Sequence, residues 1–209
     1  MSAKKPTAGV ILAAGMSTRL GRSKQLLKLK DKPLLEWVVD ACLDSLLDRI
    51  VLVLGHDAEP IMKTLAPKLA ETRVQIAFNP EYREGMSRSL QTGLSAIGPR
   101  TPSVMFLLGD QPMIDAGLID LLLKKFWASK KTICAPVFQG TRGNPVVFSR
   151  HFFDQLRQTE HDIGARHIIQ NHPDQVLAVE IDRRIYFLDV DTEDDLKTLE
   201  AALNARVPD

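Results

Sequence analysis

The sequence predicts an α/β protein in which a mostly parallel central sheet lies between two layers of helices. Four short apolar runs, bounded by Gly or Pro, are typical of buried strands: residues 10–14, 49–54, 74–78 and 103–108. Segments with helical spacing separate these runs, at residues 33–42, 60–69 and 87–97. Strands that alternate with helices in this way form parallel sheets covered on both faces. The length of 209 residues, with 44% hydrophobic and 25% charged, suits one such domain.

The alternation loosens after residue 112. We expect helices at residues 116–128, 152–158, 164–171 and 193–206, and strands at residues 132–136, 176–181 and 185–188. A polar turn at residues 139–145 precedes the apolar residues 146–148, which predicts a hairpin. No repeat or low-complexity stretch divides the chain, so residues 1–209 are predicted to form a single domain.

Composition excludes several classes of function. The formal net charge of +1 gives no general attraction to nucleic acid or to anionic membranes. The apolar run after Ala8 is too short for a signal peptide or a membrane span, so we expect a cytoplasmic protein. Cys42 and Cys134 lie in apolar surroundings without metal-ligand spacing, and we interpret both as buried thiols. The five histidines are scattered and suggest no zinc site.

The most informative stretch follows the first predicted strand. Gly15 and Gly21 flank a loop that can place successive N–H groups against an anion. Arg19, Arg22 and Lys24 add positive charge suited to phosphate oxygens. The loop fits neither the Walker A pattern nor the dinucleotide-binding fingerprint. The residues therefore predict a phosphate site, with an ordinary strand-to-helix turn and solvated basic side chains as the alternative.

Carboxylates follow two later predicted strands. Asp110 comes directly after residues 103–108, where it can hold Mg²⁺ together with phosphate oxygens, or else cap the next helix. On a strand, Asp189 and Asp191 would share one face, and either can supply a second metal ligand. Asp191 or Thr192 can equally cap the last helix. The acidic residues 193–195 are expected only to complement the dipole of that helix.

These motifs together resemble the MobA-like nucleotidyltransferases, and among them the molybdenum cofactor cytidylyltransferases. The likeness extends from the first strand to the last helix. It rests on separate motifs in the same order: Leu12-Ala13-Ala14-Gly15, Lys24, Asn79, Gly85 to Leu90, Gly109-Asp110-Gln111-Pro112, Arg142-Gly143-Asn144-Pro145, Asp162 to Arg166, and Asp189 to Thr192. Such enzymes have a three-layer, Rossmann-like fold of the nucleotide-diphospho-sugar transferase type. One departure is His161, where the family more often has glycine.

The resemblance implies transfer of CMP from CTP to the terminal phosphate of molybdopterin, with Mg²⁺ as cofactor and pyrophosphate as leaving group. By this likeness, Lys24 would contact the α-phosphate and Arg19 the β- and γ-phosphates, with Asp110 as the main metal ligand and Asp189 or Asp191 as the second. The catalytic residues would be Lys24, Arg19 and Asp110. The other nucleotide-binding residues would be Leu12, Ala13, Ala14, Gly15, Ser17, Gly21, Asn79, Gly85, Ser87 and Ser89.

The acceptor would bind in the second part of the chain. The resemblance assigns residues 8–112 to the nucleotide and residues 113–209 to the acceptor, which would contact Arg142, Gly143, Asn144, Pro145, Gly164 and Arg166. Related guanylyltransferases tend to have two glycines where this chain has Ala14-Gly15, which favours CTP over GTP. A molybdenum hydroxylase would receive the product.

Three kinds of protein remain compatible with these residues. Besides the cytidylyltransferase, they are a related guanylyltransferase or sugar- or polyol-phosphate nucleotidyltransferase, and a non-catalytic carrier of the cofactor. A carrier needs neither a lysine on phosphate nor paired carboxylates, so the residues disfavour it. Direct attack by the acceptor phosphate requires no side-chain nucleophile.

Overall fold

The central sheet holds eight strands in a computed structural model that describes residues 5–16, 23–160 and 165–204. Its order is β10-β7-β9-β6-β1-β4-β5, and β8 pairs with β7. The strands are β1 (Thr7–Ala13), β4 (Arg49–Leu54), β5 (Val74–Phe78), β6 (Ser103–Leu108), β7 (Ile133–Phe138), β8 (Thr141–Arg142), β9 (Val146–Ser149) and β10 (Val176–Glu180). All pairs are parallel except those that β8 and β9 form, which confirms the mostly parallel sheet and the predicted hairpin.

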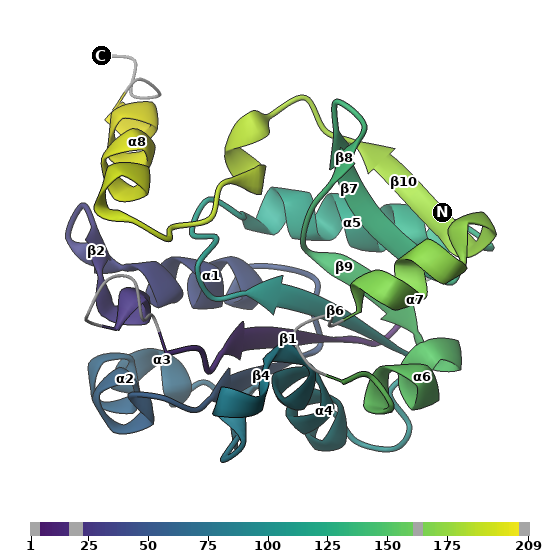
Figure 1. Ribbon diagram of the computed structural model, residues 1–209, viewed down its shortest axis with the longest axis horizontal. Helices are drawn as coiled ribbons and strands as arrows, with labels where there is room; N and C mark the ends of the chain where they lie inside the picture. The colour runs from purple at the N-terminus through teal and green to yellow at the C-terminus, as the bar shows by residue number, and fades with distance from the viewer. Residues whose placement is uncertain (1–4, 17–22, 161–164, 205–209) are drawn as a thin grey trace.

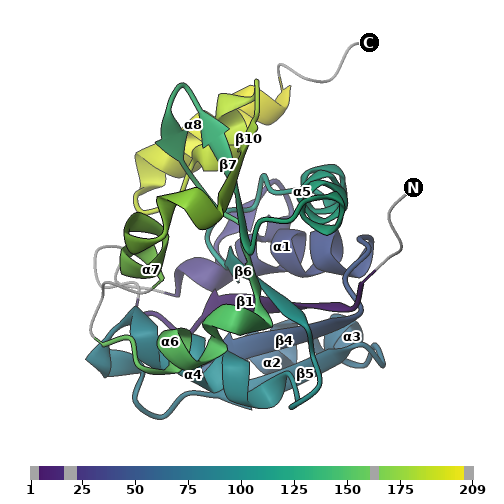
Figure 2. The same cartoon turned by 90° about the vertical axis from the view of Figure 1, so that its right-hand side faces the viewer.

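Helices cover both faces of this sheet and so complete the three predicted layers (Figures 1 and 2). Helices α1, α2, α3 and α5 lie on one side, and α4, α6 and α7 on the other. The helices are α1 (Leu34–Leu43), α2 (Ala58–Thr64), α3 (Ala66–Leu69), α4 (Met86–Ala96), α5 (Ala116–Ala128), α6 (Phe153–Arg157), α7 (Arg166–Asn171) and α8 (Glu193–Asn204). None of these helices in the described part of the chain has the length and apolar character needed to cross a membrane.

One predicted strand is wrong. Residues 184–187 form a 3-10 helix, η6 (Arg184–Phe187), instead of the strand expected at residues 185–188. Ile185 and Tyr186 are both buried, and successive residues of an edge strand do not point to the same side. The Tyr186 hydroxyl donates to Asp115 Oδ2 at 2.6 Å, which turns this segment toward the start of α5. Asp189 and Asp191 therefore follow a helical turn, and the argument that a strand places them on one face does not hold.

The order of strands reverses between β1 and β6. From β1 the chain moves outward to β4 and β5, and then returns to the other side of β1 as β6. Leu12 is paired with Leu108, and the Gly109 N–H donates to the Leu12 carbonyl at 3.0 Å. The segments that leave β1 and β6 therefore start side by side, at the position where open parallel sheets bind their ligands.

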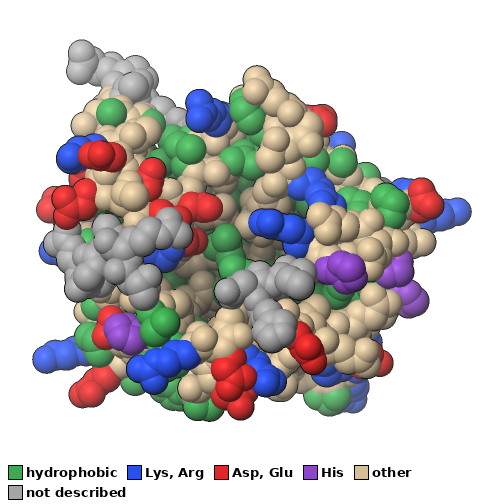
Figure 3. Space-filling view, viewed as in Figure 1, with side chains coloured by type: hydrophobic (Ala, Val, Ile, Leu, Met, Phe, Trp, Pro, Cys, Tyr) green, Lys and Arg blue, Asp and Glu red, His purple; other side chains and the backbone are tan. Residues whose placement is uncertain are grey.

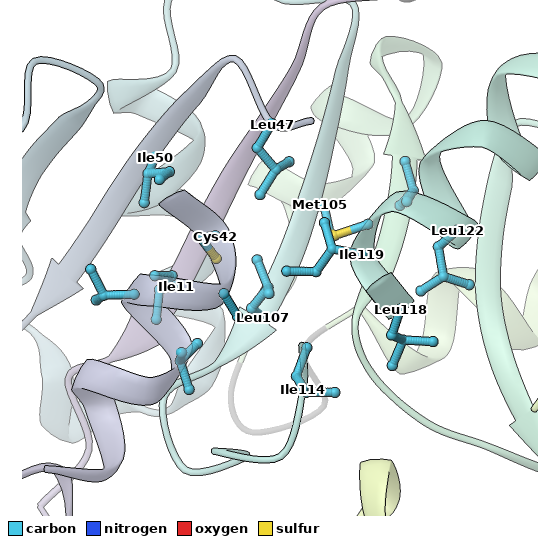
Figure 4. Packing of buried hydrophobic residues seen from close by; sticks show 14 of the residues in the cluster. Ile11, Cys42, Leu47, Ile50, Met105, Leu107, Ile114, Leu118, Ile119 and Leu122 are labelled. Atoms are coloured by element: carbon cyan, nitrogen blue, oxygen red, sulfur yellow. The ribbon is translucent and has the colours of Figure 1, made fainter. Parts of the chain in front are cut away.

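The core is divided by the sheet into two large apolar clusters. One lies between the sheet and helices α1 and α5, where Ile11, Leu107 and Ile119 are fully or almost fully buried (Figure 4). The other lies beneath α4, α6 and α7. Close packing on both faces fixes the strands from which the loops of the site extend.

A third, smaller cluster joins α8 to the segment that follows Lys24. Its buried members are Leu27, Leu29, Leu34, Met113, Ile185, Val190 and Leu199. Leu29 belongs to β2 (Lys28–Leu29), which pairs with β3 (Lys32–Pro33) in a short hairpin. We call this group the α8 cluster. It anchors the last helix to an early part of the chain.

Both thiols are expected to be unreactive in the folded protein. Cys42 and Cys134 are free and fully buried, as predicted. Burial raises the pKa of Cys134 to about 12 and also raises that of Cys42. At pH 8, only about one Cys134 side chain in ten thousand is therefore ionised. Because the thiolate is the reactive form of cysteine, reaction of the folded protein is expected to be slow. Mass spectrometry after thiol labelling is expected to show no modification in buffer and two labels in urea. Rapid labelling in buffer would contradict this.

Candidate active site

The two ends of the predicted phosphate loop lie at the carboxyl end of β1. The structure describes the chain to Met16 and again from Ser23, and Lys24 opens a short 3-10 helix, η1 (Lys24–Leu26). Five predicted site residues lie outside the described residues: Ser17, Arg19, Gly21, Arg22 and Gly164. Their roles stay predictions, as does that of the loop centre.

Gln25 holds both ends of this loop, a function that the sequence did not reveal. It is buried, and its Nε2 donates to the carbonyl oxygens of Ala13 at 3.2 Å and Gly15 at 3.4 Å. Its Oε1 accepts a hydrogen bond from Ser23 Oγ at 3.0 Å. One amide thus satisfies backbone groups on one side of the loop and a side chain on the other. Its position directly after Lys24 is the only sequence signal for this role.

Lys24 lies between two carboxylates from distant parts of the chain. Its Nζ contacts Asp110 Oδ2, and lies 3.2 Å from Asp191 Oδ1. Burial alone would lower the pKa of Lys24, but the two carboxylates outweigh it and raise that pKa. Lys24 is therefore a cation at neutral pH. The structure thus joins the predicted phosphate loop to two of the three predicted metal ligands.

Asp189 adds a third carboxylate, positioned by Gln111. Gln111 Nε2 donates to Asp189 Oδ1 at 2.6 Å, and Gln111 is itself 4% exposed. The packing around the Asp189 carboxyl group and the charge of Asp110 raise the pKa of Asp189, although the Gln111 hydrogen bond acts against them. The Gln111 Oε1 atom is buried without a hydrogen-bond partner among the described residues. Gln111 directly follows Asp110, but its type alone did not indicate this contact.

The carboxylates of Asp110, Asp189 and Asp191 suit a divalent cation that takes its other ligands from a bound phosphate compound and water. Within residues 5–16, 23–160 and 165–204, no group of three or more His, Cys, Asp or Glu side chains is arranged to hold a metal ion. Mg²⁺ usually takes only one or two carboxylates and completes its coordination with phosphate oxygens and water. The carboxylates near Lys24 provide such a partial set, and Gln111, whose Oε1 has no partner among the described residues, contacts one of them, Asp189.

Helix capping does not account for Asp110 or for the Asp191 carboxylate. Helix α5 is capped by Asp115, whose Oδ1 accepts from the Leu118 N–H at 2.8 Å. At α8, the Asp195 carboxylate accepts from the Thr192 N–H at 2.7 Å, and Thr192 Oγ1 accepts from the Asp195 N–H at 3.2 Å. This reciprocal pair is a capping box. It confirms Thr192, one of the two expected caps, and shows that Asp195 takes part in the cap besides lying near the helix N-terminus. The Asp191 carboxylate contacts Lys24 instead.

The segment after β5 lies against the start of α4. Asn79 is buried, donates to Ser89 Oγ at 3.0 Å and accepts from the Glu81 N–H at 3.0 Å. Its side chain therefore holds the turn that leads to Gly85, the residue that precedes α4. Ser87 and Ser89 are buried in the first turns of this helix. The structure brings these predicted nucleotide-binding residues together, with Asn79 engaged inside the protein.

A cavity of about 750 Å³ opens beside these groups. Its floor is apolar and comes from β1, α4, β6 and β9, through Leu12, Met86, Leu90, Phe106, Leu108, Val146 and Phe148. Its polar lining includes Arg142, Asn144, Arg166 and Asp189. Figure 3 shows a hollow in the middle of this face, with acidic side chains gathered on its left and basic ones on its right. Four of the six predicted acceptor residues, Arg142, Gly143, Asn144 and Arg166, thus share a single cavity with one carboxylate.

Close packing explains the glycine in the wall of this cavity. A Cβ atom on Gly143 would lie 2.4 Å from a carbon of the Phe187 ring. The Phe187 ring also packs against Phe138, with 5.8 Å between ring centroids. Gly143 therefore lets the segment after β8 lie directly on η6, two residues before Asp189. Pro145 is buried next to it, on the entry to β9.

Two features are those of a nucleotidyltransferase. One is the parallel sheet whose strand order reverses between β1 and β6, and the other is the lysine that contacts carboxylates at that edge of the sheet. The chain belongs to the MobA-like NTP transferase domain family, whose model matches residues 9–176. The fold and the class of enzyme that the sequence predicted are therefore confirmed.

Relatives with assigned activities fall into more than one group. The molybdenum cofactor cytidylyltransferase of Escherichia coli K12 is 27% identical over 90% of this chain and 93% of its own. A probable molybdenum cofactor guanylyltransferase of Thermococcus sibiricus is 24% identical over 72% of each chain. Among solved structures, the Rv0371c protein of Mycobacterium tuberculosis H37Rv in complex with manganese is 29% identical, with a TM-score of 0.77 over 95% of this chain and all of that one.

Proposed function

We propose that this nucleotidyltransferase transfers CMP from CTP to the terminal phosphate of molybdopterin and releases pyrophosphate. The observation that carries this proposal is the cavity lined by Arg142, Arg166 and Asp189. It lies next to Lys24 and the two carboxylates that contact it, those of Asp110 and Asp191. Its apolar floor suits a planar ring system, and its arginines suit a phosphate group. The likeness to the cytidylyltransferase over almost the whole chain supports the same reaction.

The proposed reaction needs positioned charges and no covalent intermediate. An oxygen of the acceptor's terminal phosphate attacks the α-phosphorus of CTP, and the bond from that phosphorus to the pyrophosphate oxygen breaks. Lys24 stabilises the charge that develops on the α-phosphate, and Arg19 binds the β- and γ-phosphates. Bound Mg²⁺ supplies further charge neutralisation on the triphosphate. Asp110 and either Asp189 or Asp191 are its proposed ligands.

The two parts of the chain have different proposed tasks. Residues 8–112 bind CTP through the β1 loop, Asn79, Gly85, Ser87 and Ser89. Residues 113–209 bind the acceptor through residues 142–145, Gly164 and Arg166. A molybdenum hydroxylase is the proposed recipient of the product, and the cytoplasm the proposed place of the reaction.

Base choice tests this proposal directly. Ala14 is buried, and its carbonyl accepts the His56 N–H at 3.3 Å. This contact fixes the backbone where the base is proposed to bind. With molybdopterin and Mg²⁺, we expect pyrophosphate release with CTP to exceed that with GTP, ATP or UTP by about tenfold or more in kcat/KM. A preference for GTP would assign the protein to the guanylyltransferases. Binding of the pterin without turnover on any triphosphate would indicate a carrier.

A further inference from the structure

The ammonium group of Lys24 lies between two carboxylate oxygens. Asp110 reaches it from the end of β6, and Asp191 reaches it from the segment before α8. The side chains of Lys24 and Asp110 are each 17% exposed, so water screens this contact only in part. Carboxylate oxygens that converge on one point are also the ligands that a divalent cation needs. The lysine therefore lies where a metal ion would bind.

The backbone segments that carry the two carboxylates are joined to each other and to the cap of α8. The Asp110 carbonyl accepts the Val190 N–H at 3.1 Å, so the backbones that carry the two groups are joined. The Asp191 N–H donates to Asp195 Oδ2 at 3.0 Å, inside the cap of α8. Lys24, by contrast, has a flexible four-carbon stem and an ammonium group without directional preference. If one of the three groups moves when a ligand binds, the lysine side chain is the one that can move most easily.

We propose that Lys24 is a placeholder cation, which neutralises Asp110 and Asp191 in the nucleotide-free enzyme and moves to the α-phosphate when the metal–triphosphate complex binds. Lys24 and the divalent cation then compete for the same oxygens, because two positive charges cannot share them at contact distance. The metal binds weakly before the nucleotide arrives. This inference rests on the proposed function only in placing the cation at these carboxylates, and it is independent of the base and of the acceptor.

Metal binding without nucleotide tests the competition. Free Mn²⁺ is measured by electron paramagnetic resonance during titration of the intact protein, without any triphosphate or pterin. We expect the Lys24→Met variant to bind Mn²⁺ about tenfold more tightly than the unchanged protein. A factor of this size is usual when two binding events affect each other. The same variant is expected to lose turnover. A competition for ligands thus predicts that affinity for the metal rises while activity falls.

A matched variant separates this competition from a general effect of charge. Lys32 forms a comparable pair with Asp40, and the two side chains are 27% and 22% exposed. Lys32→Met removes the same charge and is expected to leave Mn²⁺ affinity unchanged. In 0.5 M KCl, salt screens electrostatic effects beyond a few ångströms. The gain in Mn²⁺ affinity of the Lys24→Met variant is expected to persist when the titration is repeated at this salt concentration. Loss of the gain in the Lys24→Met, Asp110→Asn double variant would place the ion at Asp110.

The outcomes are distinct. Equal or weaker Mn²⁺ binding by Lys24→Met, or no binding by either protein, would overturn the placeholder role. Lys24→Gln provides a second neutral variant, and circular dichroism checks that each variant is folded. Mn²⁺ is also expected to raise the melting temperature of Lys24→Met more than that of the unchanged protein. Failure of the CTP assay with tighter Mn²⁺ binding in Lys24→Met would contradict the proposed reaction and leave the placeholder intact.

Discussion

Lys24→Ala is expected to lower kcat for pyrophosphate release by about 100- to 1,000-fold, the usual effect of removing one group that stabilises transition-state charge. The proposed place of the Lys24 ammonium in the reaction is on the α-phosphate, where charge develops as the new bond forms. Truncation at Cβ removes this ammonium and leaves the backbone of η1 in place. Initial rates with saturating CTP, Mg²⁺ and acceptor measure the effect.

The control for this variant is Lys32→Ala. Lys32 lies in the neighbouring hairpin, contacts Asp40 and packs over Trp37, with 4.5 Å between Nζ and the ring centroid. Its truncation is expected to change kcat less than about threefold, since Lys32 contacts none of the proposed ligands. A Lys24→Ala enzyme with unchanged kcat would remove Lys24 from the chemical step.

Replacing both Arg142 and Arg166 with alanine is expected to raise KM for the pterin acceptor by about 100-fold. Each guanidinium is exposed at the cavity, where it can form charge-assisted hydrogen bonds with phosphate. Loss of one such contact corresponds to about tenfold in binding. Because the arginines are proposed to hold the acceptor before and during transfer, KM is expected to change far more than kcat. Steady-state rates at varied acceptor and saturating CTP provide the measurement.

Arg150→Ala is the matched control for the two arginines. Arg150 is exposed, lies outside the cavity and packs against Phe153, with 5.5 Å between Cζ and the ring centroid. Its loss is expected to leave KM for the acceptor within about twofold. If the double variant instead raised KM for CTP and not for the acceptor, the arginines would belong to the nucleotide site.

Most of the fold follows from local signals in the sequence. The four apolar runs up to residue 108 became strands, although β1 begins three residues earlier than expected. The segments between them became helices, but the helix expected at residues 60–69 is divided into α2 and α3, while α5 matched the expected range. The strand expected at residues 185–188 failed because an apolar run of four residues fits a buried helical turn equally well. The hydrogen bond from Tyr186 to Asp115, which decides between them, joins residues that are far apart in the chain.

The candidate site was predictable in its residue types more than in its contacts. A basic loop and carboxylates after later strands indicated a phosphate and metal site, since the carboxyl ends of parallel strands meet at one edge. The sequence did not indicate that Lys24 contacts Asp110 and Asp191 directly, or that Gln25 and Gln111 hold the surrounding groups. A glutamine has no charge and no fixed spacing to reveal its partner, so only the folded chain identifies it.

The α8 cluster gives Lys24 and Asp191 a common foundation. Leu27 and Leu29 follow Lys24, Val190 precedes Asp191, and Leu199 of the last helix packs among them. If Lys24 and Asp191 have the proposed roles, a substitution that loosens α8 is therefore expected to displace both charged partners at once, and so to lower activity from a distance.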